Sequence, residues 1–306
     1  MQLEWQIGRT RDIEEVRLAV GNGEHIVLID VRRTGKSTVA LGAMEQLAHA
    51  GHLVFVLDAR EGIPDSAELA RRLRHQLCAY RTAKGKLFSG ASHAVRMLYE
   101  IGMGGTSLIE DTTIRAAVAG ALTALAPRQQ SGAEELAAAL REIGTEARRL
   151  GCSSSVLIDE VQAIASLSDG MAVQGLLRDR LAARDNQPTF VFAGSEPTAM
   201  NTLFADGGML HFHGIAHHLH AIKPADWEAG LARAFGALGC TIGEDAIREL
   251  LQESDGMPHR TMLIARETHR ILQTSGAPKN VTRGHVVAGA HAARAQEHLW
   301  RIGGDS

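Results

Sequence analysis

Cysteines, aromatic residues and excess charge are all scarce in this 306-residue chain, and each scarcity excludes a class of protein. The three cysteines, Cys78, Cys152 and Cys240, are far apart and form no CxxC pair, so neither a zinc motif nor a disulfide framework is indicated. Aromatic residues make up 4% of the chain, so aliphatic side chains must supply most of the core. The net charge of −3 gives no overall attraction to nucleic acid or to a membrane.

Long apolar runs are also missing. The N-terminal segment MQLEWQIGRTRDIEE is charged from its start and lacks the run of about 7–15 apolar residues that is typical of a secretory signal. Charged residues interrupt the other apolar stretches before they reach about 18 residues, the length needed to span a membrane. We therefore expect a reduced, cytoplasmic protein without a membrane partner.

Short β-branched runs alternate with long helical stretches over residues 1–224, which predicts an α/β domain with a parallel sheet flanked by helices. The segment of about 60–150 is too long for one crossover helix and predicts a helical insertion. Near-continuous apolar runs suit strands that are buried on both faces. The five expected strands are His25–Asp30, Leu53–Asp58, Ser155–Asp159, Thr189–Ala193 and roughly His218–Ile222.

The strand pattern ends at Pro224, and a second, helical domain is expected over residues 225–306. Asp226 is a plausible cap of its first helix, Gly239 ends that helix, and Pro258 opens the third. The four expected amphipathic helices are Ala225–Leu238, Gly243–Glu253, Pro258–Gln273 and Thr282–Ile302.

The strongest functional signal is the sequence IVLIDVRRTGKSTVA at Ile26–Ala40, in which a strand enters a tight loop and then a helix. It resembles the phosphate-binding pattern GxxxxGK[ST], with one departure, and predicts a P-loop fold with ATP and Mg²⁺ as cofactors. Backbone N–H groups around Thr34–Thr38 can cradle the β-phosphate, Lys36 would reach the β- and γ-phosphate oxygens, and the Ser37 hydroxyl would bind Mg²⁺. The expected phosphate-binding residues are Arg33, Thr34, Gly35, Lys36, Ser37 and Thr38.

One position departs from this pattern, because Asp30 stands where the first glycine is expected. That glycine often adopts a backbone geometry that other residues disfavour, although aspartate tolerates left-handed conformations better than most. The Asp30 carboxylate must also point away from the phosphates or be paired. Arg32 and Arg33 lie close enough in sequence to pair with it.

A second motif, SSSVLIDEVQA at Ser153–Ala163, is an apolar strand that ends in Asp159 and Glu160. In P-loop folds an aspartate at this strand end binds Mg²⁺, and an adjacent glutamate polarises the attacking water as a general base. The alternative, a pair that only caps the strand, is less favoured because the phosphate loop lies upstream. The strand TFVFAGS ends at Ser195, which is either a sensor of the γ-phosphate or part of an ordinary Gly-Ser turn.

Together these motifs resemble the archaeal-type P-loop ATPase family, at the border of the STAND and AAA+ classes and akin to origin-recognition ATPases. The similarity covers most of the chain and includes VRRTGKST, LIDEVQ, FAGS and the Gly256–Pro258 element. It implies that Ile7, Gly8 and Arg9 lie over the adenine, and that Arg260 contacts the γ-phosphate from a four-helix AAA+-like lid. It also implies an ATPase that acts as a nucleotide-controlled switch, with a protein partner or a homo-oligomer.

Within Phe212–Ala216 the sequence departs from that family, which usually has Gly-Arg-Ala where Ile215 holds the arginine's place. An arginine near the phosphates stabilises transition-state charge and raises turnover by about 10³-fold or more. We therefore expect slow or partner-stimulated hydrolysis, or an arginine supplied from elsewhere. A scaffold that binds ATP without hydrolysing it is an alternative that rests on Asp30 and Ile215.

Two other features suggest different functions. The segment Leu69–Tyr99 contains Arg and Lys but no Asp or Glu, which suggests an ATP-dependent nucleic-acid-binding protein of the origin or transposition type. A solvated basic helix face is the favoured interpretation. His213 and His217 would share one face only if their segment were helical, and no nearby cysteine or carboxylate cluster completes a metal site.

Overall fold

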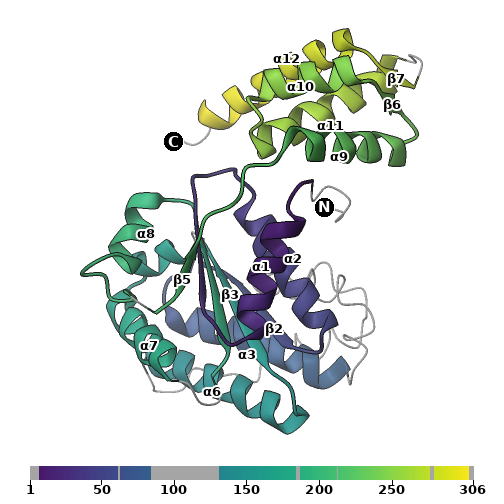
Figure 1. Cartoon of the computed structure of the whole chain (residues 1–306). Coiled ribbons are helices and arrows are strands. Elements are labelled where there is room, and N and C mark those ends of the chain that lie inside the picture. Colours follow the sequence, from purple (N-terminus) through teal and green to yellow (C-terminus); the bar gives the residue numbers. More distant parts are fainter. Residues whose placement is uncertain are drawn as a thin grey trace. The chain divides into compact units, whose positions relative to one another are not determined.

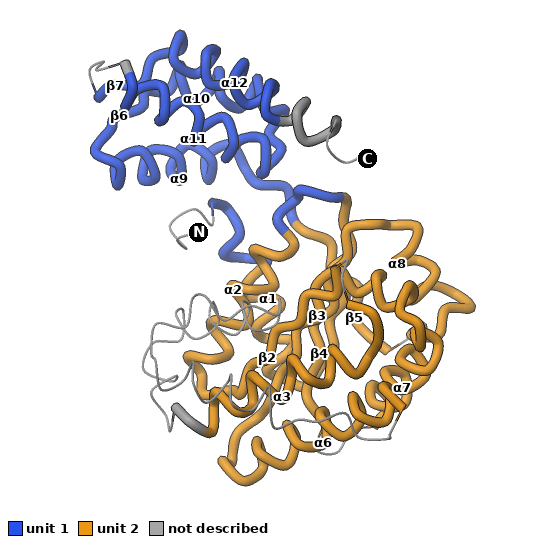
Figure 2. Tube along the Cα trace, turned by 180° about the vertical axis from the view of Figure 1, so that it is seen from behind, with its two compact units in different colours: residues 1–12, 32–35, 220–306 blue, residues 13–31, 36–219 orange. Residues whose placement is uncertain are grey.

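The structure is a computed structural model that describes residues 7–60, 63–83, 131–183, 187–211, 213–275 and 279–302. The chain divides into two compact units, which Figure 2 colours separately. The sheet unit contains residues 13–31 and 36–219, and the helical unit contains residues 1–12, 32–35 and 220–306.

A five-stranded parallel sheet forms the centre of the sheet unit, with strand order β2-β3-β4-β1-β5 (Figure 1). The expected parallel five-stranded sheet with flanking helices is confirmed, and the first four strands begin and end within one residue of their predicted bounds. The strands are β1 (Ile26–Ile29), β2 (Leu53–Asp58), β3 (Ser154–Asp159), β4 (Thr189–Gly194) and β5 (Ile215–His217).

The predicted fifth strand was placed too late in the chain. The strand that pairs with β1 is Ile215–His217, whereas residues 218–223 contain no helix or strand. Two of the three β5 residues are exposed, because β5 is the edge of the sheet. An exposed edge strand lacks the buried apolar run by which the other four strands were found.

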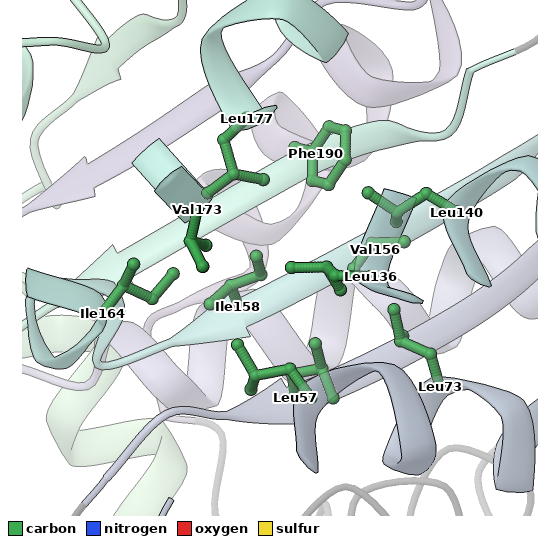
Figure 3. Close-up of a pocket in the computed structure, with 11 residues that line it drawn as sticks. Leu57, Leu73, Leu136, Leu140, Val156, Ile158, Ile164, Val173, Leu177 and Phe190 are labelled. Atoms are coloured by element: carbon green, nitrogen blue, oxygen red, sulfur yellow. The ribbon is translucent and has the colours of Figure 1, made fainter. Parts of the chain in front are cut away.

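Helices cover both faces of this sheet (Figure 1). Helix α2 (Lys36–His49) contacts β1 to β4 on one face, and α3 (Ser66–Ala83), α6 (Gly132–Leu150) and α7 (Gly170–Ala182) cover the other. Figure 3 shows leucine, isoleucine, valine and phenylalanine side chains meeting between the sheet and the three helices. They leave a cavity of ≈ 10 Å³ that is apolar throughout, so this region is packed core rather than a ligand site.

Two helices of the predicted insertion are described. α3 and α6 pack against each other, and α6 begins with a capping box in which Ser131 and Glu134 satisfy each other's backbone N–H groups. Gly151 ends α6 in the left-handed conformation (φ 67°). The rest of the insertion, residues 84–130, lies outside the described residues. The described part of the sheet unit also contains most of α1 (Thr10–Gly21), the 3₁₀ helix η3 (Val161–Ser166) and α8 (Pro197–Phe204).

The helical unit contains the four C-terminal helices that the sequence predicted, each within two residues of its expected bounds. Trp227, Leu231, Phe235 and Leu250 are buried among them. Two-residue strands β6 (Thr241–Ile242) and β7 (Asn280–Val281) also pair here, which corrects the expectation of no strands after Pro224; two residues leave no periodic pattern. The helices are α9 (Pro224–Ala237), α10 (Glu244–Ser254), α11 (Pro258–Ser275) and α12 (Arg283–Ile302).

None of the helices within the described ranges is both long enough and apolar enough to cross a membrane.

Candidate functional site

The strand register brings the candidate residues of the sheet unit to one edge of the sheet. Asp58, the last residue of β2, lies opposite Asp159, the last residue of β3. Gly194, the last residue of β4, lies opposite Ile29 of β1, which leads into the phosphate loop. Because β4 lies between β3 and β1, Ser195 emerges between the acidic strand end and the start of that loop. The carboxyl ends of parallel strands are where open α/β sheets bind ligands.

Lys36 closes the phosphate loop on itself. Its ammonium group donates hydrogen bonds to the backbone carbonyl oxygens of Asp30 (2.7 Å) and Val31 (2.6 Å). The residue is only 6% exposed. Phosphate oxygens are acceptors of the same kind and carry negative charge, so they can take over these hydrogen bonds. The contact of Lys36 with phosphate stays a prediction.

The left-handed residues of the loop are Arg33 (φ 71°) and Gly35 (φ 99°), and not Asp30. The disfavoured backbone geometry that glycine often adopts at the first position of the pattern is therefore not left-handed at Asp30. The Asp30 carboxylate instead accepts a hydrogen bond from the N–H of Val31 at 2.9 Å. A left-handed conformation costs a non-glycine residue about 1–2 kcal/mol, so the backbone strain of this loop lies at Arg33.

Asp159 is buried (2% exposed) and only partly hydrogen-bonded. Its Oδ1 accepts the N–H of Glu160 at 3.0 Å, whereas the buried Oδ2 has no hydrogen-bond partner within the described part of the chain. Burial raises the pKa of Asp159 to about 6; a hydrogen bond from the Ser37 side chain opposes this rise, and the charges of Asp58 and Glu160 add to it. A buried carboxylate with an unfilled oxygen, next to a hydroxyl, is a donor set that fits Mg²⁺.

Glu160 is oriented by hydrogen bonds to a single oxygen of its carboxylate. Oε2 accepts the Ser195 hydroxyl at 2.7 Å, the Ser195 N–H at 3.2 Å and the Gln162 side-chain amide at 2.6 Å. Burial opposes ionisation, but these hydrogen bonds and the charge of Arg60 outweigh it and lower the pKa of Glu160. The structure thus joins Ser195 to Glu160, and adds Gln162, which the sequence gave no reason to choose.

Asp58 and Arg60 are also at this edge and were missed by the sequence analysis. Asp58 is 2% exposed, and its carboxylate accepts hydrogen bonds from both the backbone N–H and the guanidinium of Arg60. The signal was present, because LVFVLD ends in an aspartate just as SVLID does. Only the strand order shows that these two strand ends are neighbours.

In the helical unit, Arg9 holds the backbone of the phosphate loop. Its guanidinium donates to the carbonyl oxygens of Thr34 and His220, both at 2.6 Å, and pairs with Asp12 at 2.9 Å. Arg9 is 5% exposed and Asp12 is fully buried, so the pair is shielded from water. The Asp12 carboxylate also accepts the His220 N–H at 3.0 Å. Arg9 therefore joins the N-terminal segment, the loop and the connection to α9.

The residues before Arg9 are tightly packed. Ile7 is 4% exposed, and a Cβ on Gly230 of α9 would lie 2.5 Å from it. Gly8 has φ 66°, and a Cβ there would lie 2.4 Å from the side chain of Ile222. Only glycine fits at position 8. The predicted adenine contact of Ile7, Gly8 and Arg9 stays a prediction.

The start of α11 also contacts the loop within the helical unit. The N–H of His259 donates to the carbonyl oxygen of Arg33 at 3.4 Å. Arg260, the next residue, forms an ion pair with Asp255 at 3.3 Å. The Gly256–Pro258 element thus places Arg260 in the same helical turn that contacts the loop. Its contact with a γ-phosphate stays a prediction.

The arginines of α3 are already paired with carboxylates. Arg71 and Arg72 pair with Glu68 on the same helix. The other described arginines pair with α6: Arg74 with Glu135 and Glu142, and Arg81 with Glu146. The absence of acidic residues from the sequence window was therefore misleading, since the counter-charges come from just before it and from α6. Lys84, Lys86 and Arg96 lie outside the described residues.

The histidine-rich segment is not helical. Residues 215–217 form β5, so His213 and His217 do not share a helix face at i, i+4 spacing. His217 lies 3.9 Å from Glu15 of α1. Ile215 is 49% exposed at the start of β5, where the family resemblance led us to expect an arginine.

Comparisons with known proteins support the fold. No protein-family model and no curated protein matches this chain. A Walker-type ATPase of Pyrococcus abyssi is 17% identical over 96% of this chain and 74% of its own, with a TM-score of 0.64. The ORC2 protein of Aeropyrum pernix is 13% identical over 94% and 68% (TM-score 0.57), and the Holliday junction branch migration motor RuvB of Thermotoga maritima is 15% identical over 94% and 70% (TM-score 0.52). The chain thus has the fold of these P-loop ATPases.

Proposed function

We propose that this chain is a Mg²⁺-dependent ATPase that acts as a nucleotide-controlled switch. One observation carries the proposal. Lys36 and the Asp159–Glu160 pair lie at the carboxyl edge of one parallel sheet, with Ser195 emerging from the strand between them. ATP hydrolysis needs a cation that binds phosphate, a carboxylate that binds the metal and a second carboxylate that accepts a proton from water.

Each residue has a separate task at this edge. Lys36 exchanges the carbonyl oxygens of Asp30 and Val31 for phosphate oxygens, while backbone N–H groups at the start of α2 bind the same phosphates. Ser37 and Asp159 are the residues that would hold Mg²⁺. When bound, the ion supplies positive charge to the β- and γ-phosphates.

Glu160 acts as the general base in this proposal. Its lowered pKa keeps the carboxylate ionised near neutral pH, so that it can accept a proton from the attacking water. Ser195 and Gln162 fix the carboxylate through Oε2. A residue at the end of β4 that touches the base is suited to report the γ-phosphate to it, which is the sensor role proposed for Ser195.

The contacts of the loop within the helical unit support a switch. Arg9 holds the carbonyl of Thr34, and the start of α11 holds the carbonyl of Arg33. A change of loop conformation on ATP binding would alter both contacts and could so reach α11 and Arg260. A protein partner or a second copy of the chain would then sense the nucleotide state.

The test is a measurement of Mg-ATP affinity and steady-state hydrolysis in the wild type, Lys36→Ala and Glu160→Gln. We expect Lys36→Ala to weaken binding about 100-fold, because it removes two charge-assisted hydrogen bonds of about 1.5 kcal/mol or more each. Glu160→Gln should still bind ATP but turn over about 10²-fold or more slowly. The control Glu196→Gln, at the exposed residue that follows Ser195, should match the wild type. Equal ATP affinity in the wild type and Lys36→Ala contradicts the proposal.

The same assay separates the alternatives. Tight Mg-ATP binding with no turnover would support a scaffold instead of an ATPase. Stimulation by duplex DNA would favour an ATP-dependent nucleic-acid-binding protein. The ion pairs that occupy the described arginines of α3 count against that second function, since paired arginines offer less charge to phosphates.

A further inference from the structure

Arg60 lies immediately beyond β2, at the same sheet edge as the acidic pair. Its guanidinium engages Asp58 side-on: Nε lies 2.7 Å and Nη2 lies 2.7 Å from Oδ2 of the carboxylate. The backbone N–H of Arg60 also donates to Oδ1 of Asp58 at 3.0 Å. The contacts of Nε and Nη2 with one buried carboxylate fix the plane of the guanidinium, which limits the entropy that a flexible arginine loses on binding.

The side chains of Arg60 and Asp58 differ greatly in their exposure to solvent. The Asp58 side chain is 1% exposed, whereas the Arg60 side chain is 55% exposed. A buried carboxylate therefore anchors a cation that remains accessible from solvent. This arrangement is typical of an arginine that binds an anion from solvent, and not of an ion pair in the core.

The charge of Arg60 acts on both carboxylates at the end of β3. This charge opposes the rise of the Asp159 pKa that burial causes, and it adds to the lowering of the Glu160 pKa. Burial and hydrogen bonding are larger influences on each pKa. Asp58 is opposite Asp159 in the register, so the side chain that holds Arg60 is the immediate neighbour of the metal-binding candidate. Arg60 is thus placed where the terminal phosphate of ATP must come if Asp159 and Glu160 have the tasks proposed above.

We propose that Arg60, anchored by Asp58, binds the γ-phosphate of ATP and supplies the positive charge that the family resemblance led us to expect at position 215. The inference rests on the proposed ATPase function and deepens it. It also predicts a preference for nucleoside triphosphates over diphosphates, because an ADP molecule leaves Arg60 without its phosphate.

An alternative is that the pair only shapes the turn after β2. The backbone hydrogen bond from Arg60 to Asp58 would then carry the role, and that bond survives replacement of the arginine side chain. Substitutions that remove the guanidinium but keep the turn therefore separate the two interpretations.

The experiment compares the affinities of the full chain for Mg-ADP and for the slowly hydrolysed analogue Mg-AMPPNP by titration calorimetry. We expect Arg60→Ala to weaken AMPPNP binding about 10-fold and ADP binding less than about 2-fold, since one charge-assisted hydrogen bond to phosphate is lost. Arg60→Lys should recover part of the AMPPNP affinity because it keeps the charge. Turnover of ATP by Arg60→Ala should fall as well.

Arg178→Ala is the matched control. Arg178 lies on α7 of the same unit, has a side chain that is 51% exposed and pairs with Asp179 at 3.1 Å. It should leave both affinities unchanged. Thermal unfolding of each variant shows that it is folded.

Four results of this experiment decide the assignment of Arg60. Unchanged AMPPNP affinity in Arg60→Ala overturns the assignment, and so does equal weakening of AMPPNP and ADP binding. A wild-type chain that binds neither nucleotide overturns the ATPase proposal itself, and with it this inference. A selective loss for AMPPNP with partial recovery in Arg60→Lys supports it.

Discussion

The phosphate loop and the acidic edge of the sheet belong to one proposed site but differ in how well their polar groups are satisfied. In the loop, the Lys36 ammonium and the carbonyl of Thr34 have close partners from the chain itself. At the acidic edge, Asp159 has a buried oxygen without a partner in the described ranges, and two further carboxylates lie nearby. The loop is complete without a ligand, and the acidic edge is not.

This difference separates the expected effects of ligand and metal. A loop that is closed by its own lysine is pre-organised, so under the proposed function we expect ATP to bind by exchanging hydrogen bonds rather than by folding the loop. At the acidic edge, the carboxylates of Asp58, Asp159 and Glu160 repel one another, and a bound divalent cation would offset this repulsion. Substitutions that loosen the loop should therefore cost stability, whereas removal of the Asp159 charge should gain it.

The largest effect is expected from Arg9→Ala, which removes the contacts of the Arg9 guanidinium with the Thr34 carbonyl and with Asp12. It leaves the buried Asp12 carboxylate without its cation, and such a loss costs about 3–5 kcal/mol. Urea unfolding measures the change. The control Arg17→Ala removes the more exposed pair of Arg17 with Glu14, which water screens, so its loss should be much smaller. Similar losses of unfolding free energy in the two variants would mean that the contacts of Arg9 do not stabilise the loop.

A smaller effect of opposite sign is expected from Asp159→Asn. The folded-state pKa of Asp159 is raised from 3.8 to about 6, so between these values the folded protein binds more protons than the unfolded one. The contribution of Asp159 to the unfolding free energy therefore falls as the pH rises through this window, by about 3 kcal/mol in total. Asparagine abolishes the fall, so at pH 7 without metal the variant should be the more stable protein, and near pH 4 the two should agree.

Magnesium provides the second arm of that test. Millimolar Mg²⁺ should raise the melting temperature of the wild type at pH 7 and leave Asp159→Asn unchanged, because an ion that binds only the folded state stabilises it. Glu160→Gln is a control of opposite sign: the Glu160 pKa is lowered, so its carboxylate contributes stability that is present at pH 7 and lost on acidification. A stability difference between the wild type and Asp159→Asn that stays the same from pH 4 to pH 7 would contradict this account of Asp159.

Most of the fold followed from sequence because its pattern is local. Buried strands such as Leu53–Asp58 are continuous apolar runs, and helices such as Glu244–Ser254 show apolar periodicity. The expected cap Asp226 was wrong, because α9 begins earlier and Asp226 lies in its first turn, with Lys223 at the N-cap position. The edge strand β5 and the two-residue β6 and β7 lack either signal, which is why they were misplaced or missed. Tertiary pairing, and not local preference, makes these short segments strands.

The candidate site was predictable where a motif fixes the chemistry. Lys36, Ser37, Asp159 and Glu160 all follow from two short patterns. Arg60 and its partner Asp58 do not, because their importance depends on the strand order β2-β3. Charge was the hardest to judge from sequence, since Glu135 and Glu146 of α6 lie far along the chain from the α3 arginines that they neutralise.

The smallest effect is expected from Ser195→Ala, which alters the contact between β4 and the general base. The substitution removes the 2.7 Å hydrogen bond from the Ser195 hydroxyl to Glu160 but keeps the bonds from the Ser195 N–H and from Gln162. Loss of one hydrogen bond to a charged group should slow turnover about 10-fold while ATP affinity changes less than about 3-fold. Ser195→Thr, which keeps the hydroxyl, should recover turnover. Faster turnover in Ser195→Ala would show that the serine restrains Glu160 in an inactive position, and the acidic edge would then be held back by its neighbour rather than awaiting a cation.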